Sequence, residues 1–191
     1  MSNNITTYSK IDFNPLQPDK EKISIDDIAH SLSLMCRANG HIKEFFSVGQ
    51  HSIYCCEEAI ARGYSNTVAL ACLLHDGSEA YMADITRPVK KSLQKYLEIE
   101  EVLQTAIYEK YIGRKLSSTE AELLSLVDDA MLYNEFIHYM NKELPTKDKV
   151  LVSSPEFKFI EFSKVENRFK ELFNELIKKC SEENLATNIK K

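Results

Sequence analysis

The sequence lacks tryptophan altogether and is poor in glycine and proline, with five of each among its 191 residues. Folds rich in β-sheet need Gly and Pro at their many tight turns, so this shortage favours helices. Nowhere does the chain carry about 20 consecutive apolar residues, the length that a bilayer span requires. Its first ten residues also lack the apolar segment of a secretory signal. The sequence therefore predicts an all-α, cytoplasmic protein with no membrane partner.

The cysteines show neither a disulfide pattern nor a zinc-binding pattern. They are odd in number and scattered, and no C-x-x-C pair occurs among them. We therefore expect reduced thiols and no structural zinc site. The positions concerned are Cys36, Cys55, Cys56, Cys72 and Cys180.

Basic residues are in deficit, because 24 Lys and Arg stand against 29 Asp and Glu and leave a formal charge of −5. Binding to a nucleic-acid polymer usually needs a basic surface, so we expect no such partner. A small phosphorylated ligand needs only a few local cations and remains compatible with this charge.

Helical patterning covers most of the chain, whose length fits a single domain. Ser24 with Asp27, and Ser117 with Glu120, have the spacing of capping boxes that open helices. No segment shows the alternation of a strand. We expect one domain over residues 1–191 with an extended arm over 1–22, helices over about 24–40, 48–62, 65–74, 99–111 and 117–140, loops over 84–88 and 141–155, and a C-terminal amphipathic helical extension over 156–184.

Metal-ligand side chains occupy places where a helix would normally bury Leu or Val. His51 lies on an apolar stripe with Val48 and Cys55. His75 and Asp76 directly follow the apolar run 69–74, where burying a carboxylate is costly unless it is paired or bound to a cation.

A third such place is the pair Asp128–Asp129 in the middle of a predicted helix. Asp129 shares a helix face with Leu132 and Phe136, whereas Asp128 shares a more polar face with Glu135. We therefore predict Asp129 as the inward carboxylate and keep Asp128 as the alternative. Two imidazoles and two carboxylates suit one divalent metal ion, either manganese, cobalt, iron, zinc or magnesium. The predicted ligands are His51, His75, Asp76 and Asp129.

Two more carboxylates and two cations follow at informative spacing. Glu79 lies one helical turn after His75, and Asp84 starts a predicted loop. A carboxylate pair beside a metal can orient and deprotonate an attacking water. Arg37 and Lys90 are candidates for binding a phosphate.

The order of a single His, a His-Asp pair and a distant Asp resembles the HD-domain phosphohydrolase superfamily over about residues 11–140. The segments FSVGQHS (46–52), LHDGSEAYMADI (74–85) and PVK (88–90) look like the bacterial HD-domain 5′-deoxyribonucleotidases and their phage-borne relatives. The element H-D-x-S-E-x-x-x-x-D is characteristic of that branch, whereas a bare His-Asp pair is not. The resemblance implies an all-α HD-domain bundle, often a homodimer.

The resemblance also implies residue roles. The family's metal ligands match His51, His75, Asp76 and Asp129. Its carboxylates that position the water and assist the leaving group match Glu79 and Asp84. Its phosphate-contacting arginine matches Arg37, and the loop that borders its nucleotide pocket matches residues 85–90.

Three positions depart from the pattern of that branch. Ala38 stands where an aromatic residue is common, Thr86 replaces the first proline of the loop, and Arg87 stands where Ser or Thr is usual. All three lie where the sugar and base are expected.

We hypothesise a metal-dependent phosphoric monoester hydrolase that releases phosphate from deoxynucleoside 5′-monophosphates. The alternative is a nucleoside triphosphate hydrolase that releases tripolyphosphate or pyrophosphate. Arg87, an extra cation in the pocket loop, is the reason for considering it. A non-catalytic nucleotide-binding module is the third alternative, and the second pair of carboxylates argues against it. The apolar final helix makes a homodimer an expectation.

Overall fold

The protein is described by a computed structural model over residues 3–189, so 1–2 of the predicted arm and 190–191 lie outside the described residues. The all-α prediction is confirmed. Among residues 3–189, none of the helices combines the length and the apolar character of a bilayer span. The helices are α1 (Ile25–Leu34), α2 (Val48–Ala61), α3 (Asn66–Leu74), α4 (Glu79–Met82), α5 (Arg87–Lys90), α6 (Gln94–Tyr111), α7 (Ser118–Met140) and α8 (Phe162–Ile189), with 3-10 turns η1 (Lys20–Lys22) and η2 (Arg37–Gly40).

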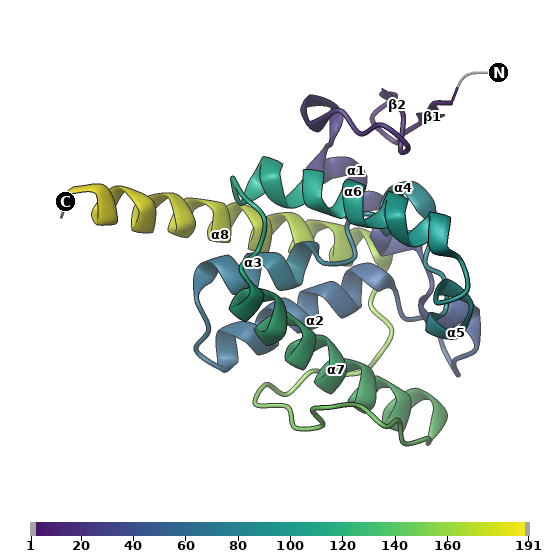
Figure 1. The fold of residues 1–191 in the computed structure, drawn as a ribbon. Coiled ribbons are helices and arrows are strands. Elements are labelled where there is room, and N and C mark those ends of the chain that lie inside the picture. Colours follow the sequence, from purple (N-terminus) through teal and green to yellow (C-terminus); the bar gives the residue numbers. More distant parts are fainter. Residues whose placement is uncertain (1–2, 190–191) are drawn as a thin grey trace.

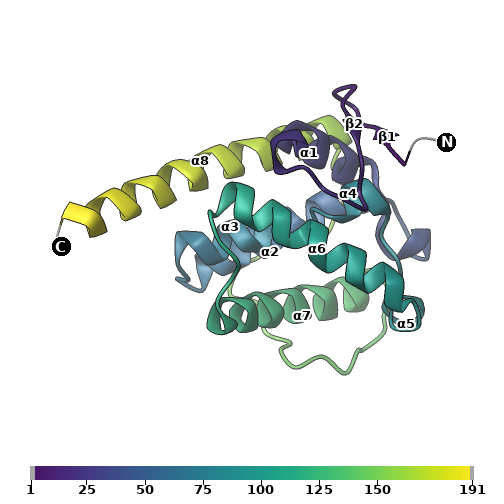
Figure 2. The ribbon, with the colours of Figure 1, turned by 45° about the horizontal axis from the view of Figure 1, so that its top comes forward.

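The pair α2 and α3 forms the centre of the bundle. Helix α8 packs on α1, α2 and α3, and α7 packs on the other side of α2 and α3 (Figure 1). Figure 2 shows α6 with the short α5 directly before it. Every residue of α3 from Val68 to Leu74 is buried, because an all-apolar helix is stable only in the middle of a core. The end of α3, where His75 and Asp76 follow, is thereby held at the centre of the molecule.

The two predicted capping boxes have different outcomes. At α7, the Ser117 hydroxyl and the Glu120 carboxylate cap each other's backbone as predicted. At α1, the capping box is wrong, since the Ser24 side chain makes no cap hydrogen bond. Asp27 instead accepts a hydrogen bond from the Ser9 backbone N–H at 2.6 Å, which ties the N-terminal arm to α1.

Helix α1 ends at Leu34, earlier than the predicted Gly40. Met35 turns to an extended conformation, and Cys36 pairs with Ser47 in an isolated β-bridge. Arg37–Gly40 then forms the separate turn η2. The bridge between Cys36 and Ser47 brings the start of this turn beside the residue that caps α2.

The expectation of no strand is wrong for the arm. Strands β1 (Ile5–Thr6) and β2 (Asp12–Phe13) pair antiparallel, and each is too short to produce a readable alternation. Phe13 is completely buried, with its ring 4.4 Å from that of Tyr81. This anchor holds the arm against α4.

Other boundaries differ modestly from the predictions. Helix α6 begins at Gln94 rather than near Ile99, and α8 begins at Phe162 rather than at residue 156. The short helix α5 lies at the end of the predicted 84–88 loop. Residues 141–161 connect α7 to α8 without a helix or strand.

Candidate metal centre and cavity

Two imidazoles and two carboxylates from α2, α7 and the end of α3 meet at one point. The Nε2 atoms of His51 and His75 lie 3.3 Å apart. Asp128 Oδ1 lies 3.2 Å from the first and 3.8 Å from the second. Asp76 places Oδ1 3.3 Å from His75 Nε2 and Oδ2 3.9 Å from His51 Nε2. These distances fit donors that surround one small cation.

Each histidine is oriented by a second partner on its other ring nitrogen. His75 Nδ1 donates to the Cys72 carbonyl oxygen at 2.7 Å, which leaves Nε2 free as a donor of its lone pair. His51 Nδ1 lies 2.5 Å from Glu135 Oε1, and His51 is completely buried. A carbonyl or carboxylate behind the ring is the usual arrangement for metal-ligating histidines.

Asp128, and not the predicted Asp129, faces the histidines. The Asp129 carboxylate instead approaches Arg87 Nη1 at 3.4 Å and accepts a hydrogen bond from the Lys147 backbone N–H at 3.4 Å. The preference for Asp129 assumed that the most apolar face of α7 points inward. The structure rotates α7 so that Asp128 and Glu135, two helical turns apart, point toward the cluster.

Glu135 is a site residue that the sequence prediction missed. Glu135 is 4% exposed, and its carboxylate bonds both His51 and Arg37. The available signal was its spacing of seven residues from Asp128, which places both side chains on one helix face.

Cys55 is a further candidate donor. Its Sγ lies 3.5 Å from His51 Nε2, and it forms with His51, His75 and Asp128 a group whose ligand atoms all lie within 4.8 Å of one another. Burial raises the pKa of the Cys55 thiol to about 11, so the neutral thiol is favoured. Asp76 differs, because His75, His51 and Arg37 overcome the effect of burial and hold its pKa below the ordinary value. Asp76 also places its two carboxylate oxygens within 4 Å of both histidine Nε2 atoms, so we take Asp76 as the fourth donor and Cys55 as the alternative.

A cavity of about 610 Å³ opens beside this cluster. Five carboxyl groups and three basic side chains line it, so the acidic groups outnumber the basic ones. The donor chemistry and this excess of acidic groups both fit a divalent metal ion. These lining residues are Asp76, Glu79, Asp84, Asp128, Glu135, Arg37, Arg87 and Lys90.

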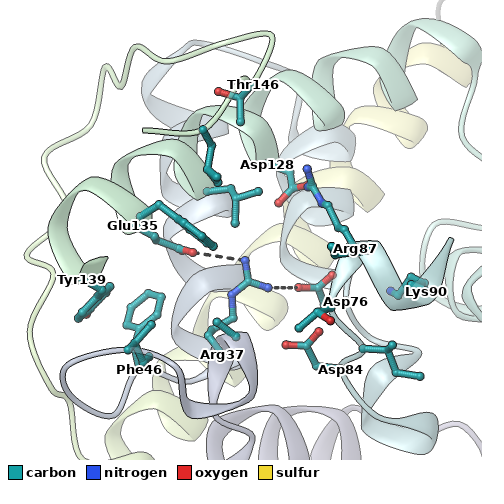
Figure 3. A pocket seen from close by; sticks show the side chains of 18 of the residues that line it. Arg37, Phe46, Asp76, Asp84, Arg87, Lys90, Asp128, Glu135, Tyr139 and Thr146 are labelled. Carbon is teal, nitrogen blue, oxygen red and sulfur yellow. Dashed lines mark hydrogen bonds and ion pairs between the residues drawn. The ribbon is translucent and has the colours of Figure 1, made fainter. Parts of the chain in front are cut away.

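Arg37 lies at the centre of this lining (Figure 3). It approaches Asp76 Oδ2 at 3.5 Å and Glu135 Oε2 at 3.3 Å. Burial would lower its pKa, but Glu135 and Asp76 raise it above the ordinary value, so the cation persists. The next residues, Ala38 and Asn39, both adopt positive φ angles, of 51° and 50°. This left-handed turn follows directly on Arg37, whose side chain enters the cavity.

Glu79 and Lys90 form a second pair of polar side chains in the cavity. Lys90 Nζ lies 3.3 Å from Glu79 Oε1 and 2.7 Å from Glu100 Oε1. Glu79 Oε2 is buried and has no hydrogen-bond partner among the described residues. Burial, with the charges of Asp76 and Asp84, raises the pKa of Glu79 to about 9. One carboxylate oxygen is thus available to a ligand.

The structure brings the remaining predicted residues to the same cavity. Asp84 lines it after the turn at Ala83, whose φ is 132°. Arg87, with a side chain 54% exposed, bonds Asp128 Oδ2 at 2.6 Å. Of all the predicted site residues, Asp129 is the one turned away from the metal-ligand cluster.

Comparison with known proteins leaves the activity open. No family model matches the chain. It is 37% identical over 123 residues to the uncharacterized protein YfdR of Escherichia coli K12, an alignment that covers 64% of this chain and 66% of that protein. It is 37% identical over 99 residues to the uncharacterized protein RCAP_rcc00048 of Rhodobacter capsulatus, an alignment that covers 49% of this chain and 50% of that protein. The chain thus spans just under two thirds of the length of the first relative and half of the length of the second. The name of neither relative states an activity.

Proposed function

We propose that this chain is a divalent-metal-dependent phosphohydrolase that acts on nucleotides, with deoxynucleoside 5′-monophosphates as substrates. The observation that carries this proposal is the convergence of His51, His75, Asp76 and Asp128 on a cavity that also holds Arg37, Lys90 and two spare carboxylates. The resemblance of the same segments to HD-domain 5′-deoxyribonucleotidases supports it, with Asp128 taking the place expected for Asp129.

Each residue of the cavity has a separate role in the proposed reaction. Arg37 and Lys90 bind the phosphoryl oxygens, since a guanidinium fork and an ammonium both match that group. Glu79 orients a water for in-line attack through its unpartnered Oε2. Asp84, on the same cavity wall, relays one proton of the attacking water to the leaving 5′ oxygen, and the other proton stays on the released phosphate. When bound, the metal ion polarises the phosphoryl group and makes water a better nucleophile.

Two alternatives remain as outcomes of the assay. Arg87 adds a third cation to the cavity, which favours a longer phosphate chain and release of tripolyphosphate or pyrophosphate. A nucleotide-binding module without turnover would show tight binding and no product.

The test is product analysis by chromatography with nucleoside mono-, di- and triphosphates, each with manganese, cobalt, magnesium and zinc. We expect nucleoside and inorganic phosphate from the monophosphates, and a loss of roughly 10³-fold or more in Asp76→Ala at unchanged helical content. Asp26→Ala, which changes an exposed carboxylate on α1, is the matched control and should retain turnover. Unchanged turnover in Asp76→Ala would overturn the assignment.

A further inference from the structure

A second pocket, of about 420 Å³, lies between the N-terminal arm, α1 and α4. Figure 2 shows the two strands of the arm beside these helices. We name it the arm pocket, and its lining residues come from 5–8, 27–35 and 80–81. Glu79 lines the cavity of the metal centre, whereas the next residue of α4, Ala80, lines the arm pocket. None of the described residues lines both, so the arm pocket is a separate site.

The arm pocket contains a buried carboxylate that is only half satisfied. Asp27 is 3% exposed, and its Oδ1 accepts a hydrogen bond from the Ser9 backbone N–H at 2.6 Å. Its Oδ2 is buried and has no hydrogen-bond partner among the described residues. A buried carboxylate oxygen without a donor is costly. Asp27 therefore favours a ligand that brings a hydrogen-bond donor or a positive charge.

Apolar and aromatic side chains make up much of the remaining lining. Ile5, Tyr8 and Leu34 are 38%, 61% and 47% exposed, so three large side chains with apolar surface gather at the edge of the pocket. Such a grouping of exposed apolar side chains is typical of a binding site. Tyr8 also stacks on His30 with ring centroids 3.6 Å apart, and aromatic faces attract cations. A ligand with an apolar body and a cationic group would match both parts of the lining.

The charge of the arm pocket is opposite in character to what a phosphate ester needs. No lysine or arginine lines it among the described residues, whereas Arg37, Arg87 and Lys90 line the cavity of the metal centre. His30 does line the arm pocket, but its Nδ1 lies 2.9 Å from Glu166 Oε2. An anion would therefore meet an uncompensated carboxylate at Asp27. A single carboxylate also offers too few oxygens to hold a metal ion.

We propose that the arm pocket binds a small organic cation, with an ammonium group on the free oxygen of Asp27 and an apolar body against Ile5, Tyr8 and Leu34. The volume of about 420 Å³ lies within the usual range of small-molecule sites. This site is independent of the proposed hydrolysis, because it shares no lining residue with the cavity among those described.

The test uses three probes that share a phenyl body and differ in charge, namely 2-phenylethylamine, 2-phenylethanol and 3-phenylpropanoate. Each is titrated at neutral pH into the full chain and followed by backbone amide shifts in two-dimensional NMR. The amine should bind about tenfold more tightly than the alcohol, because a hydrogen bond to a charged group is lost, and the anion should not bind. The amide shifts caused by the amine should gather at residues 5–8, 27–35 and 80–81.

Asp27→Asn keeps an acceptor for the Ser9 N–H but removes the charge, so amine binding should weaken about tenfold. Asp26→Asn is the matched control, since Asp26 is the preceding residue on α1 and its side chain is 59% exposed and pairs with Lys170. Equal affinity for the three probes, equal amine affinity in wild type and Asp27→Asn, or amine shifts gathered at residues 84–90 of the cavity would overturn the proposal. The absence of saturable amine binding would overturn it as well. The probe series on the wild type decides the question even if Asp27→Asn loosens the arm.

Discussion

Helix α2 carries two buried polar clusters two turns apart, and they differ in how completely their groups are satisfied. Glu58 is completely buried and accepts hydrogen bonds from the backbone N–H groups of Val152 and Ser153, the Ser153 hydroxyl and Arg62 Nε. Arg62 in turn bonds Asp148 at 2.8 Å and the Val150 carbonyl at 2.7 Å. In this cluster, donors and acceptors match.

The cluster around His51 does not balance in this way. Its carboxyl groups outnumber the basic side chains that line the cavity, and Glu79 Oε2 is buried without a partner among the described residues. The balanced Glu58 cluster fastens the α7–α8 connector to α2, whereas the unbalanced His51 cluster is suited to a ligand. Substitutions in the two clusters should accordingly have opposite signatures, one in stability and the other in function.

The largest expected effect is on turnover in Asp128→Asn. Loss of a metal ligand should reduce metal-dependent hydrolysis by roughly 10³-fold or more, while the denaturation midpoint of the metal-free protein changes little. Asp129→Asn is the matched control, since Asp129 faces Arg87 and the Lys147 backbone. Steady-state kinetics and isothermal titration with manganese measure both variants. Equal losses in the two would contradict the orientation of α7.

Glu58→Gln should show the reverse signature. The amide nitrogen of Gln would face backbone N–H donors, so we expect a loss of about 2–3 kcal/mol in the free energy of unfolding, with metal affinity unchanged. Glu57→Gln is the control, because Glu57 and its partner Arg168 are 38% and 43% exposed and such pairs contribute little. Urea denaturation of the three proteins provides the comparison.

The pH dependence of unfolding sharpens this second prediction. Burial would raise the pKa of Glu58, but its hydrogen bonds from Ser153, Val152 and Arg62 lower it below the ordinary value. Its stabilisation is therefore present above the unfolded-state pKa and is lost as pH falls through the folded-state pKa. The stability difference between wild type and Glu58→Gln should shrink from pH 7 toward pH 3. A constant difference would show that the carboxylate charge is irrelevant.

Glu135→Gln should have an intermediate effect on function. The amide would weaken the contact that orients His51, and substitutions behind a ligating histidine typically lower metal affinity by about 10–100-fold. His138→Gln, one turn later on the exposed side of α7, should leave affinity unchanged. Metal titration measures both, and unchanged affinity in Glu135→Gln would remove Glu135 from the site.

The smallest effect is expected for Cys55→Ser. Because we take Asp76 as the fourth donor, cobalt affinity should be retained, and the wild-type cobalt complex should lack a thiolate-to-cobalt charge-transfer band. Such a band, lost in Cys55→Ser and kept in Cys72→Ser, would instead identify Cys55 as the ligand in the group with His51, His75 and Asp128.

Prediction from the sequence succeeded where a pattern is local. The capping box at Ser117 and Glu120 forms as predicted, and the apolar run 69–74 is buried throughout. It failed where a distant partner competes for a local group. Asp27 binds the backbone of Ser9 instead of capping its own helix, and the bridge between Cys36 and Ser47 ends α1 early.

Local sequence alone determined that this chain is helical and that His51, His75 and Asp76 stand where apolar residues would otherwise be buried. The tertiary structure decided which carboxylate of α7 joins them. Neighbouring residues on a helix point about 100° apart, so the choice between Asp128 and Asp129 depends on the rotation of α7 about its axis. That rotation is set by packing against α2 and α3, and it brings Glu135 behind His51 and Phe136 into the cavity.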